Sequence, residues 1–389
     1  REPWWYHNQT YRITRAAGLN NIGTSMIKNP FQPYSDKPTT VDGIYSQAEV
    51  GLANRNSGIL LETLALDITP TGGHYLLNHF DVPLLDSVKH RLEFSGSFET
   101  PFELSIEEIK AMPAVTMPVT MECAGNGRAG VSPRSHSMPW MYEAVGTSEW
   151  TGTKLAPLIE RACPNNDVVE ISFTGADYGY DMGEPHFFGR SLRLAQIREL
   201  DVLLVYAMNG APLLPQHGAP LRIIVPGWYG MASVKWLANI KALTKPYDGF
   251  QQIKTYQFKT HKDDVGIPIQ TIRVKSLMVP PGVPDWSTRK RFVSAGAVDL
   301  VGRAWSGGGT PIVKVEVEIA GDWRPAKLSA NRDRYAWQKW TFSWQAEPGD
   351  YILRCRASDA NGNVQPLDPP WDQAGFANNA AQCVHVFVK

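Results

Sequence analysis

Met121-Glu-Cys-Ala-Gly-Asn-Gly-Arg128 is the stretch around which this chain is organised. It follows residues 114–121, where apolar and β-prone residues dominate, so the sequence predicts a strand that delivers Cys123 to a tight turn. Gly125 and Gly127 let the backbone turn sharply and approach a bound group closely, and Arg128 offers a planar cationic fork. A cysteine at such a strand end is well placed for chemistry.

Three interpretations of this stretch compete. The spacing of Gly125, Gly127 and Gly130 matches the dinucleotide fingerprint, but a dinucleotide site needs a helix that begins inside the glycine run. Here Pro133 and Pro139 bracket a polar loop without helical periodicity, which argues against that site. The second interpretation is a buried structural cysteine beside an ordinary turn. In the third, the cysteine is a thiolate ligand to a soft metal centre whose other ligands come from a cofactor.

The run 123–128 is similar to the molybdenum-binding signature of the sulfite oxidase family, which the eukaryotic assimilatory nitrate reductases share. Other family motifs follow in the same order, and together they cover about residues 58 to 250. An ordered set of motifs is far more specific than any single one. The set comprises Tyr75-Leu-Leu-Asn-His79, Trp150-Thr-Gly-Thr-Lys-Leu155, Asp177 after Phe-Thr-Gly-Ala, Tyr206-Ala-Met-Asn-Gly-Ala-Pro-Leu213, His217 and Arg222 in Gln-His-Gly-Ala-Pro-Leu-Arg, and 225–237.

Length and charge limit the fold and the partners. At 389 residues the chain exceeds the usual size of a single core, which predicts two domains. Lys+Arg and Asp+Glu both total 38, so the net charge is +0 and no bulk field attracts nucleic acid or an anionic membrane. No window of about twenty apolar residues occurs, which predicts no membrane span. Any preference for anions must therefore come from a local cluster of positively charged side chains.

The four cysteines form no CxxC pair, no haem attachment motif and no zinc spacing. Cys355 and Cys383 lie on predicted strands, where we expect two buried free thiols rather than a disulfide. The chain begins at Arg1 rather than Met, which we take to indicate that an upstream segment, with any export signal, was removed or not included. The compartment, periplasmic or cytoplasmic, is therefore left open.

The sequence divides near residue 255. Residues 1–255 form the predicted cofactor-binding catalytic domain, with the polar, turn-rich residues 1–57 expected to wrap around it. Short helices and short strands alternate here, which is typical of an α+β domain. The expected helices are 105–112, 150–162 and 191–200, and the expected strands include 92–98, 168–173, 202–206 and 221–225.

Residues 256–389 show strands without helices. Over 313–319, Val and Ile alternate with charged residues, which indicates a half-exposed strand. The pattern recurs over 337–344 and 351–358, and a last strand is expected at 383–388. These features predict an immunoglobulin-like β-sandwich. In the family that the chain resembles, such a domain mediates homodimerisation.

The resemblance implies molybdenum carried by molybdopterin. A cofactor with a phosphate and an anionic dithiolene needs cationic and backbone donors around it, and a thiolate completes the soft coordination. Cys123 is the implied metal ligand, and Asp177 is the implied acceptor for the pterin ring. His217 is implied to bind the cofactor, although taken alone it also fits a histidine whose hydrogen bonds are satisfied before a turn. The other implied cofactor-binding residues are Tyr75, Leu76, Leu77, Asn78, His79, Arg222, Ser233, Val234 and Lys235.

The resemblance also implies oxidation of sulfite to sulfate by oxygen-atom transfer from a Mo-oxo centre. Arg128, Trp140 and Tyr247 match the family's positions for binding the anion. The family has arginine before the Asn-His pair, whereas this chain has Leu77, whose aliphatic side chain cannot supply the planar guanidinium group of an arginine. Arg190 is the candidate replacement, although it equally fits a surface or pterin-contacting residue.

No cytochrome b5-like segment, haem attachment motif or flavin fingerprint is present, so electrons are expected to pass to an external acceptor such as a cytochrome c. The resemblance, together with these missing motifs, thus implies a homodimeric, haem-free sulfite dehydrogenase of the bacterial type. One alternative is the same fold and cofactor acting on another sulfur compound or on nitrate. The other is a metal-free binding relic, against which the intact Cys123, Arg222 and Lys235 argue.

Overall fold

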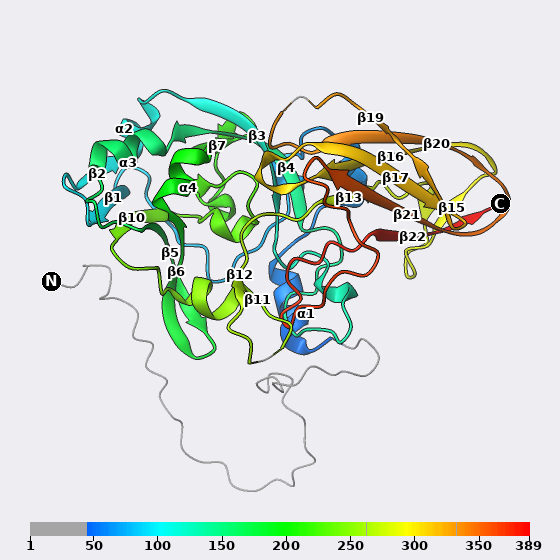
Figure 1. The fold of residues 1–389 in the computed structure, drawn as a ribbon, viewed down its shortest axis with the longest axis horizontal. Coiled ribbons are helices and arrows are strands. Elements are labelled where there is room, and N and C mark those ends of the chain that lie inside the picture. Colours follow the sequence, from blue (N-terminus) through cyan, green and yellow to red (C-terminus); the bar gives the residue numbers. More distant parts are fainter. Residues whose placement is uncertain (1–44, 262, 332) are drawn as a thin grey trace, which may run out of the picture. The chain divides into compact units, whose positions relative to one another are not determined.

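A computed structural model describes residues 45–261, 263–331 and 333–389 (Figure 1). The segment that we expected to wrap the catalytic domain, residues 1–57, therefore lies mostly outside the described residues. Its last part forms the helix α1 (Gln47–Arg55). This helix begins with a capping box, in which the Ser46 hydroxyl accepts from Glu49 N–H and the Glu49 carboxylate accepts from Ser46 N–H.

A mixed sheet forms the first layer of the α+β region in the described part of the chain. The strand β1 is parallel to β10, and the other neighbouring pairs are antiparallel. The helix expected over 105–112 is present but shorter, as α2 (Ile106–Lys110), with a capping box between Ser105 and Glu108. In order across the sheet, the strands are β2 (Phe102–Ser105), β1 (Arg91–Gly96), β10 (Leu237–Leu243), β5 (Glu170–Asp181) and β6 (Glu184–Arg193).

A second, antiparallel sheet carries the cysteine motif. Cys123 directly follows β3, as predicted, and Arg222 begins β9. The strands expected at 202–206 and 221–225 are confirmed. The sheet comprises β3 (Val115–Glu122), β4 (Val145–Lys154), β7 (Leu203–Met208), β8 (Ala211–Pro212) and β9 (Arg222–Ile224), which pairs with β7.

Two of the helix predictions were partly wrong. Residues 150–154 end the strand β4, where Trp150 to Lys154 pair with β7, and only α3 (Ala156–Ala162) is helical. Residues 191–193 likewise end β6, and the helix α4 (Leu194–Glu199) follows them. In both places the hydrogen bonds to a neighbouring strand outweigh a local helical pattern.

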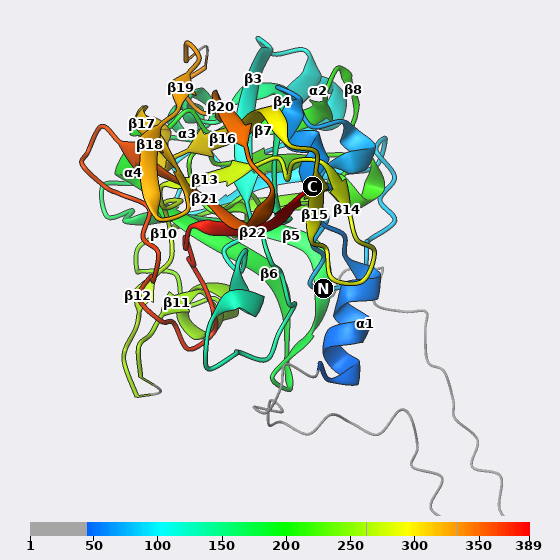
Figure 2. The same cartoon turned by 90° about the vertical axis from the view of Figure 1, so that its right-hand side faces the viewer.

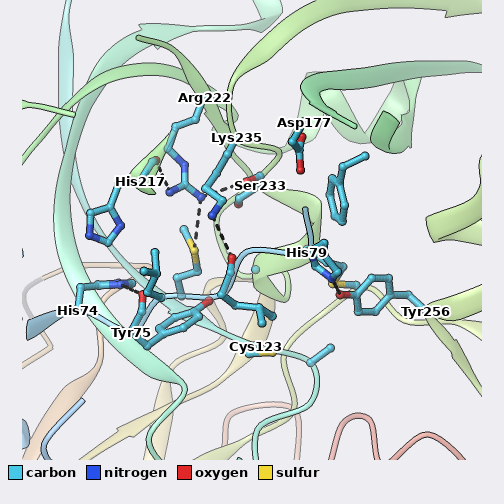
Figure 3. A pocket seen from close by; sticks show the side chains of 17 residues that line it. His74, Tyr75, His79, Cys123, Asp177, His217, Arg222, Ser233, Lys235 and Tyr256 are labelled. Carbon is cyan, nitrogen blue, oxygen red and sulfur yellow. Dashed lines mark hydrogen bonds between the residues drawn. The ribbon is translucent and has the colours of Figure 1, made fainter. Parts of the chain in front are cut away.

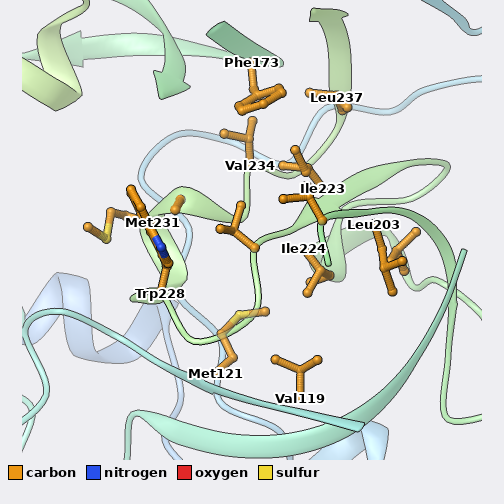
Figure 4. Packing of buried hydrophobic residues seen from close by; sticks show 14 of the residues in the cluster. Val119, Met121, Phe173, Leu203, Ile223, Ile224, Trp228, Met231, Val234 and Leu237 are labelled. Atoms are coloured by element: carbon orange, nitrogen blue, oxygen red, sulfur yellow. The ribbon is translucent and has the colours of Figure 1, made fainter. Parts of the chain in front are cut away.

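A buried apolar cluster supports the strands that carry Cys123 and Arg222 (Figure 4). Val119 and Met121 of β3 lie on the side of Ile224 of β9, and Ile223 points the other way, towards Val234 of the same cluster (Figure 4). Burial of each such side chain stabilises the fold by about 1.5–3 kcal/mol. The core therefore fixes the position of β3, which leads to Cys123, relative to β9, which begins with Arg222.

The C-terminal region contains two β-sheets around a separate core, as expected for a sandwich. Figure 2 shows β22, which leads to the C-terminus, beside β15. In the described part of the chain, one sheet has the order β13 (Lys275–Met278), β16 (Gly296–Trp305), β20 (Gln338–Ala346), β19 (Lys327–Leu328). The other has the order β14 (Val283–Pro284), β15 (Arg291–Val293), β22 (Gln382–Val388), β21 (Gly349–Asp359), β17 (Ile312–Ile319), β18 (Asp322–Pro325).

The short pair β11 (Gln257–Phe258) and β12 (Ile267–Pro268) lies between the two regions in the chain. The exact domain boundary near residue 255 stays a prediction. Within the described ranges, no helix has both the length and the apolar character that crossing a membrane requires.

Cys355 and Cys383 are both free, as expected, but only Cys355 is buried. The prediction that Cys383 is buried was wrong. Its neighbours Gln382 and Val384 point into the domain. Because side chains alternate along a strand, Cys383 between them faces solvent.

Candidate cofactor site

A pocket opens beside the end of β3, with an empty volume of about 650 Å³ that includes the part open to solvent. Figure 3 shows its side chains converging from several loops and strands. Most of the residues predicted to bind a cofactor line it, although they lie far apart in the sequence. The lining comprises His74, Tyr75, Leu76, Leu77, His79, Met121, Cys123, Ala124, Asp177, Phe188, His217, Arg222, Gly230, Met231, Ser233, Lys235 and Tyr256.

Cys123 is presented to this pocket by a turn with defined hydrogen bonds. Its N–H donates to Ala144 O at 2.9 Å, and its carbonyl accepts from Asn126 N at 3.0 Å. Gly127 has φ +97°, which favours glycine at that position. Burial raises the pKa of the Cys123 thiol, whereas the Arg128 charge, the Gly125 N–H and the Trp140 indole favour the thiolate. A metal bound there would further favour the thiolate.

Arg222 forms part of a cationic cluster at the other end of the pocket. Its Nη1 donates to His217 O at 2.9 Å, and its Nη2 donates to Ser233 O at 3.0 Å (Figure 3). Burial lowers the pKa of Arg222 to about 10, so its guanidinium is still charged at neutral pH. Burial and the neighbouring cationic groups lower the pKa of His217 to about 3, so its imidazole is neutral.

Lys235 is the second cation of the cluster. Its Nζ donates to Leu77 O at 2.9 Å, to Gln216 O at 3.1 Å and to Asn78 Oδ1. Burial lowers the pKa of Lys235 well below its usual value. A nearby anion would favour the ammonium form.

The donors in this pocket fit an anionic cofactor. Among the described residues, no carboxylate forms an ion pair with Arg222 or Lys235 within 4.0 Å. Arg222 Nε and Asp177 Oδ1 are buried without a hydrogen-bond partner, again within the described part of the chain. Burial raises the pKa of Asp177 to about 6. Unpaired buried groups of this kind suit a phosphate at the cations and an N–H group at the carboxylate.

Tyr256 was not predicted, yet it lines the pocket together with Cys123. Its hydroxyl lies 2.7 Å from His79 Nε2, and Phe188 packs against the His79 ring. Tyr256 and Phe188 stand outside every motif used above, so no local signal marked them. The other residues of the lining that were not singled out are His74, which precedes the motif 75–79, and Met121, Ala124, Gly230 and Met231, which lie inside the motifs 121–128 and 225–237.

Six predicted residues lie outside the described lining of the pocket: Asn78, Arg128, Trp140, Arg190, Val234 and Tyr247. Asn78 still bonds to Lys235. Arg128 lies beside the cysteine turn, where its Nε donates to Ala374 O at 2.7 Å and its Nη1 to Met138 O at 2.8 Å.

Arg190 does not reach the pocket. Only 2% of it is exposed, and it donates to Gln251 O at 2.7 Å and to Ile269 O at 3.3 Å. Tyr247 lies with its hydroxyl against Gly189. Among the described residues, Arg222 is the one arginine in the pocket lining, and the replacement role of Arg190 stays a prediction.

Comparison with known proteins matches both regions of the chain. Residues 79–251 match the oxidoreductase molybdopterin binding domain, and residues 267–389 match the Mo-co oxidoreductase dimerisation domain. Mitochondrial sulfite oxidase of Homo sapiens is 32% identical over 428 residues, covering 100% of this chain and 75% of that protein. The NADH nitrate reductase of Ulva prolifera is 29% identical over 80% of this chain and 39% of its own length.

A solved structure shares the fold. The sulfane dehydrogenase SoxCD from Paracoccus pantotrophus superposes with a TM-score of 0.72 and 21% identity, covering 95% of this chain and 96% of that one. The arrangement of an α+β domain followed by a β-rich domain is therefore that of a known molecule.

Proposed function

The chain belongs to the sulfite oxidase family of molybdopterin-dependent oxidoreductases, and from this premise we propose that it oxidises sulfite to sulfate at the pocket beside Cys123. The observation that carries this proposal is that the buried Cys123 shares one pocket with the buried cations Arg222 and Lys235, and that no carboxylate among the described residues forms an ion pair with either cation. Such a pocket suits a soft metal on an anionic carrier. The match to the dimerisation domain supports a homodimer.

Different residues of the pocket would bind different parts of the cofactor. Cys123 would ligate molybdenum. Arg222 and Lys235 would bind the phosphate, with the backbone near Ser233 as a further donor, and Asp177 would accept from the pterin. When bound, the molybdenum centre supplies oxygen-atom transfer and takes up two electrons. Those electrons would pass to an external acceptor such as a cytochrome c.

The chain's own groups bind the anion and control a proton. Burial raises the pKa of the Tyr256 hydroxyl, so the phenol keeps its proton at neutral pH. Burial and the charges of Lys235 and Arg128 lower the pKa of His79 to about 3, so its imidazole is neutral. If His79 Nε2 carries the hydrogen and donates to Tyr256, the phenolic O–H is free to donate to an oxyanion. The Arg128 guanidinium adds positive charge beside the cysteine turn.

A second candidate substrate is a sulfur compound with less negative charge than sulfite. Leu77 lines the pocket where the family carries arginine, and Arg190 is engaged by two carbonyls elsewhere. The pocket thus offers an oxyanion fewer charge-assisted hydrogen bonds, each of which contributes about 1.5–3 kcal/mol.

The test is elemental analysis for molybdenum together with steady-state kinetics on the same preparation. We expect about one molybdenum per chain, oxidised-pterin fluorescence after denaturation, and sulfite-dependent reduction of cytochrome c. Protein without molybdenum would contradict the cofactor assignment. If the protein contains molybdenum but has a higher kcat/KM for a neutral organic sulfur compound than for sulfite, that compound class replaces sulfite as the proposed substrate.

A further inference from the structure

Glu122, the residue before Cys123, is a buried carboxylate that the proposed reaction does not use. Only 1% of it is exposed. Its Oε1 accepts from Lys275 Nζ at 2.6 Å and from Asn126 Nδ2 at 3.0 Å, and its Oε2 accepts from Trp305 Nε1 at 2.9 Å. Lys275 is only 2% exposed, so water does not screen this ion pair. Removing one member of such a pair leaves an uncompensated buried charge.

The two strong donors come from the other region of the chain. Lys275 of β13 and Trp305 of β16 are paired neighbours in the C-terminal sheet, inside the span that matches the dimerisation domain. Together they reach across to a carboxylate at the end of β3. The C-terminal region therefore contacts the cofactor-binding region one residue away from the cysteine.

Asn126 extends this network to the backbone of the turn. Its Oδ1 accepts from Ala144 N at 3.1 Å, and Ala144 O accepts from Cys123 N at 2.9 Å. Asn126 N also donates to Cys123 O at 3.0 Å. Hydrogen bonds thus connect Lys275, through Glu122 and Asn126, to both backbone groups of Cys123.

Segment 374–378 of the C-terminal region holds the same turn at three further points. Ala377 N donates to Ala124 O at 2.7 Å, and Asn378 Nδ2 donates to Gly127 O at 2.7 Å. Arg128 Nε donates to Ala374 O at 2.7 Å. Because these contacts bracket the turn, its conformation depends on a region far away in the sequence.

We infer that Lys275 and Glu122 are positioning residues, through which the C-terminal domain fixes the turn that presents the Cys123 thiolate. This inference rests on the proposed role of Cys123 as the molybdenum ligand. The competing explanation is that the pair adds stability alone, as any buried ion pair between two regions would.

Arg303 supplies a matched control for that explanation. It lies in β16 with Trp305, is 2% exposed, and donates to Asp67 Oδ1 at 2.7 Å, Leu64 O at 2.7 Å and Ala65 O at 2.9 Å. It joins the same two regions, but none of its hydrogen bonds involves residues 121–128 in the described structure. Losing it should lower stability without moving the cysteine.

The first experiment compares Mo(V) electron paramagnetic resonance spectra of the holoenzyme variants, because those spectra respond to the orientation of the cysteine sulfur at the metal. Lys275→Met should shift the g values or split the signal. The double variant Glu122→Gln/Lys275→Met, which leaves no unpaired charge, should return the spectrum towards that of the wild type. Arg303→Met should lower the melting temperature but leave the spectrum unchanged. A wild-type spectrum for Lys275→Met, or an equal shift for Arg303→Met, overturns the inference.

The second experiment needs no metal and measures alkylation of Cys123 by iodoacetamide in cofactor-free protein, with peptide mass spectrometry to separate the other cysteines. Lys275→Met should raise the rate about fivefold or more, because a loosened turn opens more often. Arg303→Met should not. If the protein binds no molybdenum, the proposed function fails while this rate still tests the positioning role.

Trp305→Phe is a second variant that tests the same network if the Lys275→Met protein does not fold. It removes the indole N–H that donates to Glu122 Oε2, together with part of a buried ring, and it leaves no charge unpaired. We expect a smaller increase in the alkylation rate, about twofold. A rate unchanged from the wild type in every foldable variant of this network means that the pair does not position Cys123.

Discussion

The hydroxyl of Tyr256 lies 2.7 Å from Nε2 of His79, and both side chains line the pocket that contains Cys123. Tyr247, which matches the family's anion-binding tyrosine by sequence motif, lies outside the described lining of that pocket. Two tyrosines are therefore candidates for one role, and kinetics can distinguish them.

Tyr256→Phe should lower kcat/KM for sulfite by about tenfold to a hundredfold, because a hydrogen bond to a charged group contributes roughly 1.5–3 kcal/mol. The molybdenum content should not change. Tyr247→Phe is the matched control and should retain nearly full activity. The reverse result would support the motif-based assignment of Tyr247.

Cys123→Ser should abolish turnover and leave the fold intact, because a hard oxygen ligand replaces a soft thiolate on molybdenum. Circular dichroism and sedimentation would check the fold and the oligomeric state. Cys163→Ser is a suitable control, since Cys163 lies outside the pocket and bonds to Glu99. More than a few per cent of residual activity in Cys123→Ser would be incompatible with the ligand role.

Arg190→Ala should destabilise the protein by about 1–3 kcal/mol while the KM for sulfite stays unchanged. The loss is expected because the carbonyls of Gln251 and Ile269 would lose their donor in a buried place. Denaturant unfolding and steady-state kinetics of the same variant test both parts. A KM raised tenfold or more, partly reversed by Leu77→Arg, would restore Arg190 as the replacement for the family's arginine.

Cofactor-free protein should lose stability as the pH falls from 6.5 towards 4. Burial lowers the pKa of His79 and His217 to about 3 and that of His74 to about 4. The unfolded chain therefore binds protons in this window that the folded chain does not, so the free energy of unfolding decreases with falling pH. Asp177 acts in the opposite direction, because its raised pKa makes the folded chain bind a proton below about 6.

Urea unfolding at pH 7, 6 and 5 measures this slope. His79→Gln should reduce it, and His261→Gln, at an exposed position, should leave it unchanged. Equal slopes in the wild type and His79→Gln would show that His79 does not carry this pH dependence.

Several features of this protein were readable from local sequence. The apolar run 114–121 before a glycine turn predicted that a strand delivers Cys123, and the alternation over 313–319 predicted a half-exposed strand. The order of the motifs predicted the family. These signals depend on neighbouring residues, whose spacing reflects the two-residue period of a strand or the backbone freedom of glycine.

Only the tertiary structure decided the rest, because those features depend on contacts between distant segments. Residues 150–154 became a strand since β7 pairs with them. Tyr256 lines the pocket. Arg190 lies outside the lining and donates to carbonyls more than sixty positions away in the chain. Glu122 read as an ordinary residue before the cysteine, and its bond to Lys275 spans 153 positions. No local pattern encodes such a pair, since its free energy arises only once both partners are buried together.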